Sequence, residues 1–269
     1  MSRHYKIKAT LSDQVNTSFR ISTRIYHIIH RKKDVEKFPI IINNFNRLEW
    51  LQQQIEWLLS IGQKNIHVID NASTFDPLLR YYKKIPATVY FLDRNKGHEA
   101  LWRTHIFQRL GKYFYVYTDP DVLPTKDTPT DFMYYFVDVL KRYPKMDKVG
   151  FGLKTDDIPD HYPKKSEVLA WEGGLLTHEL EPGLFHSKID TTFALYRPGI
   201  AFQKWETTIR CGSPYELRHM PWYNNMNNLS EEEQFYMDYA NDSGSWIKNI
   251  VGEDHRYSLP ERGRPESKI

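Results

Sequence analysis

The stretch FPIIINNFNR, residues 38–47, decides the fold of this chain. Its β-branched run Ile40–Ile42 is typical of a parallel strand that is buried on both faces of a sheet. Apolar residues then recur at helical spacing through residues 48–61, and Gly62 follows at the position that favours a helix C-cap. The sequence therefore predicts a buried strand that leads through an asparagine-rich turn into an amphipathic helix.

The same order of a short apolar strand and a helix repeats along the first half of the chain. Further strands are expected at 65–70, 88–92 and 113–118, and further helices at 77–84 and 99–110. Short turns between alternating strands and helices are the pattern of right-handed βαβ units, which build a parallel sheet. We therefore expect an α/β fold.

The second half of the chain is less regular. Helices are expected at 131–143 and 231–239, the latter with Ser230 as its N-cap, and strands at 148–153 and from Asp190 to Arg197. The stretch between Thr155 and Asp190 is rich in Pro, Gly, His and charged residues, so it predicts loops rather than sheet. Because loops on a rigid scaffold commonly carry specificity, we expect this stretch to contribute to substrate binding.

Length and composition narrow the class of protein. A chain of 269 residues suffices for one large α/β domain, and an apolar fraction of 40% is too high for a disordered chain. Cys211 is the single cysteine, which excludes an intramolecular disulfide and a CxxC metal site. No apolar run approaches the ~20 residues of a membrane-spanning helix, and the N-terminus has no apolar signal segment, so the sequence predicts a cytoplasmic protein.

Positive charge is concentrated at the N-terminus. Residues 1–37 hold nine Lys and Arg against three acidic residues, a net charge of +6, which leaves the rest of the chain at about −3. We interpret this basic segment as a helix that packs on the main domain with a solvated basic face, or as a peripheral contact with an anionic membrane surface. The acidic remainder disfavours nucleic acid as the partner.

Polar residues follow each of the four predicted strands of the first half. Ligands of open α/β sheets bind beyond the carboxyl ends of the strands, so these residues are expected to share one edge. They are Asn43, Asn44, Asn46 and Arg47, then Asp70, Asn71 and Ser73, then Asp93, Arg94, Asn95, Lys96 and Gly97, and finally Asp119, Pro120 and Asp121. Short amides for a base and ribose, cations for phosphates and paired carboxylates for a divalent metal together suit a nucleotide.

The triplet Asp119-Pro120-Asp121 directly follows the aromatic strand YFYVYT, and this position, rather than the triplet itself, carries the signal. Residues i and i+2 at a strand end point the same way, and Pro120 restricts the backbone between them. Two such carboxylates can bind Mg²⁺ or Mn²⁺, with waters and substrate phosphates completing the octahedron. The alternative is an Asx-Pro turn that caps the strand.

Taken in order, the segments PIIINNFNR, VIDNAST, DRNKG and YTDPDV resemble the nucleotide-binding half of GT-A-fold glycosyltransferases, especially family-2-like ones. The resemblance covers residues 38–125 well and the remainder loosely. It implies a single domain with a GT-A-type, Rossmann-like mixed sheet flanked by helices. It divides the chain into the basic N-terminal segment 1–37, a nucleotide-sugar-binding half 38–125, an acceptor-binding half 126–251 and a polar C-terminal tail 252–269.

The resemblance also implies roles for individual residues of the donor site. In that reading, the uridine is contacted by Asn43, Asn44 and Asp70, and Arg94 and Lys96 lie near the ribose or diphosphate. Arg47 and Asn71 belong to the same donor site. Asp119 and Asp121 form the DxD motif. In the family the second Asp commonly binds the metal ion directly, while the first approaches the ribose or a metal-bound water. His219 is the best-placed histidine for a further metal or phosphate ligand, and the alternative is a loop histidine bound to a backbone carbonyl.

The E-D pair that supplies the catalytic base in many inverting members has no clean match in this sequence. Asp190 is the first candidate for the base, because DTTFALYR resembles the segment that closes the acceptor site in the family. Glu172 is the second, since WEGG suits a sugar-binding loop, and both are expected to line an acceptor pocket with Trp171. Glu231, Glu232 and Glu233 begin a predicted helix, where acidic side chains favour the macrodipole, so a catalytic role for them is a lesser alternative.

These observations predict a metal-dependent glycosyltransferase that moves a sugar from a nucleotide diphosphate donor, a UDP-sugar, to a glycan or lipid-linked acceptor. One alternative is a sugar-nucleotidyltransferase, but NNFNRLEW lacks the glycine-rich loop that this class carries after the first strand. The other alternative is a non-catalytic carbohydrate-binding relative, and the retention of both Asp119 and Asp121 argues against it.

Overall fold

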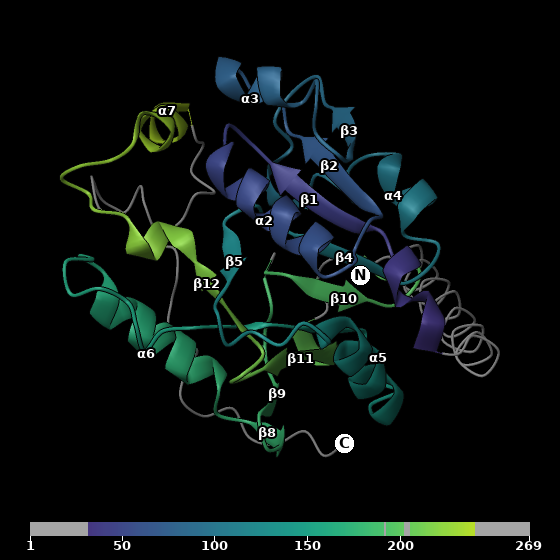
Figure 1. Cartoon of the computed structure of the whole chain (residues 1–269). Coiled ribbons are helices and arrows are strands. Elements are labelled where there is room, and N and C mark those ends of the chain that lie inside the picture. Colours follow the sequence, from purple (N-terminus) through teal and green to yellow (C-terminus); the bar gives the residue numbers. More distant parts are fainter. Residues whose placement is uncertain (1–31, 191, 202–204, 240–269) are drawn as a thin grey trace, which may run out of the picture.

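The computed structural model describes residues 32–190, 192–201 and 205–239, in which helices lie against both faces of a large mixed sheet (Figure 1). The α-helices are α2 (Glu49–Ser60), α3 (Asp76–Tyr81), α4 (Ile106–Leu110), α5 (Phe132–Arg142), α6 (Lys165–Leu175) and α7 (Glu231–Tyr239). The 3₁₀-helices are η1 (Lys32–Lys37), η2 (Gly97–Glu99), η3 (Trp205–Thr207) and η4 (Met220–Tyr223). Apart from η1, the expected basic segment 1–37 lies outside the described residues, as does the tail 252–269.

The strands form two sheets. They are β1 (Ile40–Asn44), β2 (Ile66–Asp70), β3 (Thr88–Phe91), β4 (Tyr115–Thr118), β5 (Val122–Pro124), β6 (Lys148–Gly150), β7 (Gly152–Leu153), β8 (Glu179–Glu181), β9 (Leu184–His186), β10 (Ala194–Tyr196), β11 (Thr208–Cys211) and β12 (Glu216–His219). The nine-stranded sheet has the order β3-β2-β1-β4-β10-β6-β11-β9-β8, and the three-stranded sheet has the order β5-β12-β7.

The first four strands of the large sheet are parallel, as the βαβ pattern of the sequence predicts. In the register, Ile40 of β1 faces both Ile66 of β2 and Val116 of β4. β10 then pairs antiparallel with β4 and with β6, which makes the sheet mixed. The expected fold class, a Rossmann-like mixed sheet flanked by helices, is confirmed.

The two faces of the sheet bury separate apolar clusters, because successive side chains of a strand point in opposite directions. Ile40 and Ile42 of β1 belong to the larger cluster, which includes apolar residues of α2, α3 and α5. Ile41 lies between them in sequence and belongs to the other cluster, with Leu110 of α4. β1 is therefore buried on both sides, as its unbroken isoleucine run predicts.

The small sheet brings a distant part of the chain to the end of β4. β12 pairs antiparallel with β5, so that His219 faces Val122 in the register. Just beyond this pair, the backbone N–H of Met220 donates a 2.8 Å hydrogen bond to the carbonyl of Asp121. His219 is consequently the last residue of a strand that lies beside the Asp119–Asp121 triplet, and not a loop residue.

Most of the expected elements are found, with the predicted helix 99–110 as one exception. The structure has the single turn η2 and the short helix α4 there, separated by turns. Thr104 lies in the gap, and its hydroxyl donates to the carbonyls of Ala100 and Leu101 at 3.0 Å each. Such back-bonding by a threonine competes with regular helix and explains the shorter α4.

The interpretation of residues 155–190 as loops is wrong. This stretch contains the helix α6 and the hairpin β8–β9, which extends the large sheet through pairing of β9 with β11. Val168, Glu172 and Leu175 are buried at helical spacing in α6, a pattern that Gly173 and the following glycine obscure in the sequence. Glu172 therefore lies on a helix and not in the sugar-binding loop that its surroundings suggested.

The strand expected from Asp190 to Arg197 is shorter in the structure, where β10 begins at Ala194. The carbonyls of Ile189 and Asp190 accept hydrogen bonds from the Lys148 ammonium group instead, at 2.7 and 3.5 Å. The capping of α7 is as expected, since the backbone N–H of Glu233 donates to the Ser230 hydroxyl at 3.2 Å. No helix among the described residues is both long and apolar enough to cross a membrane.

Candidate functional site

Three groups of polar side chains lie at the carboxyl ends of β1, β2 and β4. The first is built from amides. The side-chain amides of Asn43 and Asn71 both donate to the carbonyl of Gly97, at 3.3 and 3.0 Å, and Asn71 accepts from the backbone N–H of Lys96 at 2.7 Å. The loop after β3 is thereby held against the ends of β1 and β2, and Lys96 is brought to the same edge.

The second group surrounds Asp70, the last residue of β2. The hydroxyl of Tyr82, just beyond α3, donates to Asp70 at 2.9 Å, and Asn44 at the end of β1 donates to that hydroxyl at 2.9 Å. The other oxygen of Asp70 accepts from the backbone N–H of Ser73 at 3.1 Å. Burial and the neighbouring carboxylate of Asp70 raise the pKa of Tyr82 well above its usual value, so its hydroxyl stays protonated and keeps donating.

The loops that follow β1 and β2 also brace each other directly. Asn46 has a positive φ of 53°, a conformation that asparagine adopts more readily than most residues. Its backbone N–H donates to the Ser73 hydroxyl, and its side-chain oxygen accepts from the backbone N–H groups of Thr74 and Phe75 at 2.7 and 3.0 Å. The asparagine-rich turn of the sequence is thus a rigid part of this edge.

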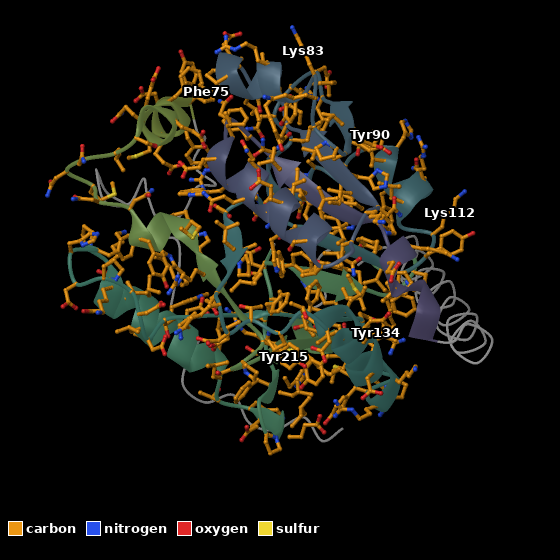
Figure 2. The ribbon with its side chains drawn as sticks, in the orientation of Figure 1. Phe75, Lys83, Tyr90, Lys112, Tyr134 and Tyr215 are labelled. Atoms are coloured by element: carbon orange, nitrogen blue, oxygen red, sulfur yellow. The ribbon has the colours of Figure 1, made fainter. Side chains whose placement is uncertain are left out.

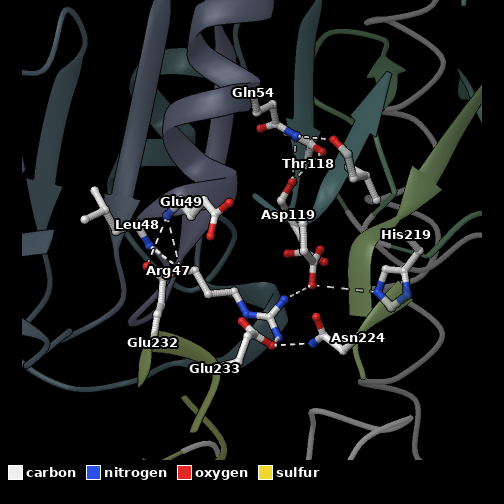
Figure 3. Close-up of polar contacts among 12 residues, drawn as sticks. Arg47, Leu48, Glu49, Gln54, Thr118, Asp119, His219, Asn224, Glu232 and Glu233 are labelled. Atoms are coloured by element: carbon white, nitrogen blue, oxygen red, sulfur yellow. Dashed lines mark hydrogen bonds and ion pairs between the residues drawn. The ribbon is translucent and has the colours of Figure 1, made fainter. Parts of the chain in front are cut away.

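The third group is centred on Arg47, whose side chain is only 3% exposed (Figure 3). Its guanidinium donates to Asp121 at 2.6 Å and lies 3.4 Å from Glu233 of α7. The rings of Trp50 and Tyr236 lie 4.3 and 3.8 Å from its central carbon. Burial disfavours the charged form, but the surrounding carboxylates outweigh this cost and raise the pKa of Arg47, which stays cationic.

His219 approaches Asp121 from the other side. Its Nε2 lies 3.7 Å from the Oδ2 atom of Asp121, and its Nδ1 is buried with no hydrogen-bond partner among the described residues. Burial lowers the pKa of His219, so the imidazole is neutral at neutral pH, with one ring nitrogen as a donor and the other as an acceptor or metal ligand. The backbone carbonyl of Asp119 accepts from the Gln54 side chain at 3.0 Å (Figure 3).

Helix α7 contributes two carboxylates, from the glutamates for which the sequence indicates a helix start first and a catalytic role only as a lesser alternative. Glu232 accepts from the backbone N–H groups of Leu48 and Glu49 at 2.8 and 3.1 Å, and so caps the N-terminus of α2. Glu233 accepts from the Asn224 amide at 3.0 Å besides pairing with Arg47. Burial raises the pKa of Glu233. The capping pattern beginning at Ser230 was visible in the sequence, but it signals a helix start and not the partner of a side chain.

Aromatic contacts fix α7 over the loops after β1 and β2. Phe235 of α7 packs on Phe75, with the ring centroids 5.1 Å apart, and Figure 2 places Phe75 beside this helix. Tyr236 meets Phe45 edge-on at 6.3 Å. The helix therefore lies over the loops after β1 and β2, next to the Arg47 group.

The two candidates for the catalytic base differ in their surroundings. The Glu172 carboxylate is buried and paired with the Arg210 guanidinium of β11, in contact through Nη2 and Oε2. Asp190 is exposed, and its backbone carbonyl accepts a 3.5 Å hydrogen bond from the Lys148 ammonium group. The structure thus engages Glu172 in an ion pair and leaves Asp190 exposed. Arg94 is an exposed residue of the loop after β3.

No protein-family model matches the chain, and no curated protein matches it. Among solved structures it is similar to TarS residues 1–349 from S. aureus, with 12% identity and a TM-score of 0.42 over 68% of this chain and 60% of that one. It is also similar to glucosyl-3-phosphoglycerate synthase from Mycobacterium tuberculosis in complex with Mn²⁺, UDP-glucose and phosphoglyceric acid, with 16% identity, a TM-score of 0.38 and coverage of 62% of both chains. A mycobacterial protein has 14% identity and a TM-score of 0.44 over 82% of this chain and 79% of that one. The chain thus spans about 60% of the length of the first two.

Proposed function

We propose that this protein is a glycosyltransferase that moves a sugar from a nucleotide diphosphate donor, a UDP-sugar, to a glycan or lipid-linked acceptor with the help of a divalent metal ion. The observation that carries the proposal is the meeting of Asp121, His219 and Arg47 at the same sheet edge as the amides of Asn43 and Asn71. A nucleotide diphosphate needs these three kinds of group at one place: amides for the base and ribose, a cation and a metal site for the phosphates.

Asp121 and His219 have the chemistry of a site for Mn²⁺ or Mg²⁺. Their facing atoms are 3.7 Å apart, and ligands at about 2 Å from one ion lie within such a distance of each other. The imidazole is neutral, and its buried Nδ1 atom has no hydrogen-bond partner among the described residues. The described residues contain no cluster of three or more His, Cys, Asp or Glu with metal-site geometry, so waters and the diphosphate would complete the shell.

When bound, the ion would neutralise charge on the leaving diphosphate. The protein's own residues carry out the other tasks. Arg47 and Lys96 supply fixed positive charge at the edge, while Asn43, Asn44, Asp70 and Asn71 hold the loops that receive the base and ribose. On the acceptor side we assign the role of proton acceptor to Asp190, which is exposed, in preference to Glu172, which Arg210 already engages.

Donor binding tests the proposal directly. UDP-, GDP-, CMP- and dTDP-sugars are compared with and without Mn²⁺ by thermal shift, and a UDP-sugar is expected to raise Tm most, and only with the metal present. Slow Mn²⁺-dependent hydrolysis of that donor separates an enzyme from a non-catalytic carbohydrate-binding protein. If none of the four donors raises Tm with or without Mn²⁺, the proposal is wrong.

The variant Asp121→Asn checks that the response arises at this site. It keeps the shape of the side chain and removes the charge, so it is expected to abolish both the Mn²⁺-dependent Tm shift and the hydrolysis. Asp127→Asn is the matched control, because Asp127 is an exposed aspartate a few residues further along the chain. An Asp121→Asn protein with an unchanged Mn²⁺ response would place the metal elsewhere.

A further inference from the structure

Arg47 and His219 face the same oxygen atom of Asp121. The guanidinium Nη1 lies 2.6 Å from Asp121 Oδ2, and the imidazole Nε2 lies 3.7 Å from that atom (Figure 3). A metal ion held by Asp121 and His219 would therefore share its carboxylate ligand with a permanently charged cation. Two positive charges around one carboxylate oxygen repel each other strongly in a buried setting.

Arg47 is built into this position and is not a surface side chain that happens to reach it. Its side chain is 3% exposed, two aromatic rings enclose its guanidinium, and Glu233 of α7 holds its second amino group. These partners come from three places: Asp121 from the turn after β4, Trp50 from α2, and Glu233 with Tyr236 from α7.

The arrangement is nevertheless incomplete in its hydrogen bonding. The Nε atom of Arg47 and the Oε1 atom of Glu233 are both buried and have no partner among the described residues. A buried polar atom without a hydrogen bond lowers the stability of the fold, and the loss is larger when the atom belongs to a charged group. An anion that enters beside Arg47 would supply an acceptor for the Nε atom and, once a metal ion is bound, would reduce the positive charge around Asp121.

We propose that Arg47 couples the binding of the metal ion to the binding of the nucleotide diphosphate. Without the donor, Arg47 neutralises Asp121 and weakens the binding of a divalent cation there. With the donor, the diphosphate is shared by Arg47 and the metal ion, and the repulsion between them is relieved. The inference rests on the proposed function, because it takes a diphosphate as the ligand and Asp121 with His219 as the metal site.

Calorimetry with Mn²⁺ and UDP tests this coupling without any turnover. Mn²⁺ is titrated into the wild-type protein alone and with saturating UDP, and UDP is expected to tighten Mn²⁺ binding by at least about tenfold. In Arg47→Gln, Mn²⁺ alone is expected to bind about tenfold more tightly than in the wild type, and the effect of UDP is expected to fall to about threefold or less. Reciprocity requires that saturating Mn²⁺ tighten the binding of UDP by the same factor by which saturating UDP tightens the binding of Mn²⁺.

Two further variants keep the test interpretable. Arg47→Gln leaves Glu233 as a buried carboxylate without its cation, so the double variant Arg47→Gln/Glu233→Gln removes both charges and guards against misfolding. Arg80→Gln is the matched control, since Arg80 forms an exposed ion pair with Asp76 within α3 and is expected to leave every Mn²⁺ affinity unchanged.

The outcomes separate the coupling from the proposed function. If UDP tightens Mn²⁺ binding equally in the wild type, in Arg47→Gln and in the double variant, the coupling role of Arg47 is overturned while the metal site stands. If Mn²⁺ binds to no form of the protein, with or without UDP, the metal site of the proposed function fails and the coupling fails with it.

Discussion

The hydroxyl of Tyr82 donates a 2.9 Å hydrogen bond to the carboxylate of Asp70, which ties the end of helix α3 to the last residue of β2. Tyr82 is buried, and Asn44 of β1 donates to the same hydroxyl. One oxygen atom thus joins two parallel strands and a helix at the edge where the donor is proposed to bind.

Tyr82→Phe is expected to destabilise the protein. The change removes the hydroxyl and leaves a buried carboxylate and a buried amide without their partner, which costs about 1–3 kcal/mol of the free energy of unfolding. Urea denaturation measures the difference. Tyr134→Phe is the control, because Tyr134 is exposed, and equal stability of the two variants would show that the Tyr82 network contributes nothing.

Asp70→Asn is expected to raise the KM for the donor with a smaller effect on kcat. The carboxylate organises the loop that receives the base or ribose, so its loss weakens binding of the donor in the ground state and in the transition state alike. Steady-state kinetics with varied UDP-sugar measures both constants. Asp76→Asn, an exposed aspartate of α3, serves as the control, and an unchanged donor KM in Asp70→Asn would remove Asp70 from the site.

Asp190→Asn and Glu172→Gln are expected to differ in kind. Asp190→Asn removes a proton acceptor and should lower kcat by about 10²–10⁴-fold at unchanged donor affinity. Glu172→Gln breaks a buried ion pair with Arg210 and should instead lower the free energy of unfolding by about 3–5 kcal/mol. Turnover and urea denaturation are measured on both variants. A stable Glu172→Gln protein with no activity would make Glu172, and not Asp190, the proton acceptor.

Lys148 is expected to make stability depend on pH. Burial lowers the pKa of its ammonium group to about 7, although Asp190 opposes the shift, whereas the pKa in the unfolded chain is the usual 10.5. Between these values the unfolded state binds more protons, so this lysine contributes a rise in the free energy of unfolding as pH increases from about 7 to about 10.5. The slope is at most about 1.4 kcal/mol per pH unit.

Urea denaturation of the wild type and of Lys148→Met across this pH range isolates the effect, because the difference between the two curves reports Lys148. Lys112→Met, at an exposed lysine, is expected to follow the wild-type curve. Parallel curves for the wild type and Lys148→Met would mean that Lys148 keeps an ordinary pKa in the folded protein.

The first half of the fold could be predicted from the sequence because its signals are local. The isoleucine run of β1, the helical periodicity of α2 and the positive φ of 86° at Gly62 all depend on residues within a few positions of one another. The position of Asp119 and Asp121 after an apolar strand followed from the same reasoning. The local pattern alone therefore predicts a polar edge at the carboxyl ends of the strands.

What the tertiary structure alone decided lies in contacts between distant segments. Arg47 and Glu233 are 186 positions apart, and the sequence around either residue does not indicate that the two side chains form an ion pair. The pairing of Glu172 with Arg210 and the addition of β8–β9 to the sheet are of the same kind. Periodicity reports which face of an element is buried, but the partner of a buried charge is set by how the elements pack, and only the folded chain specifies that.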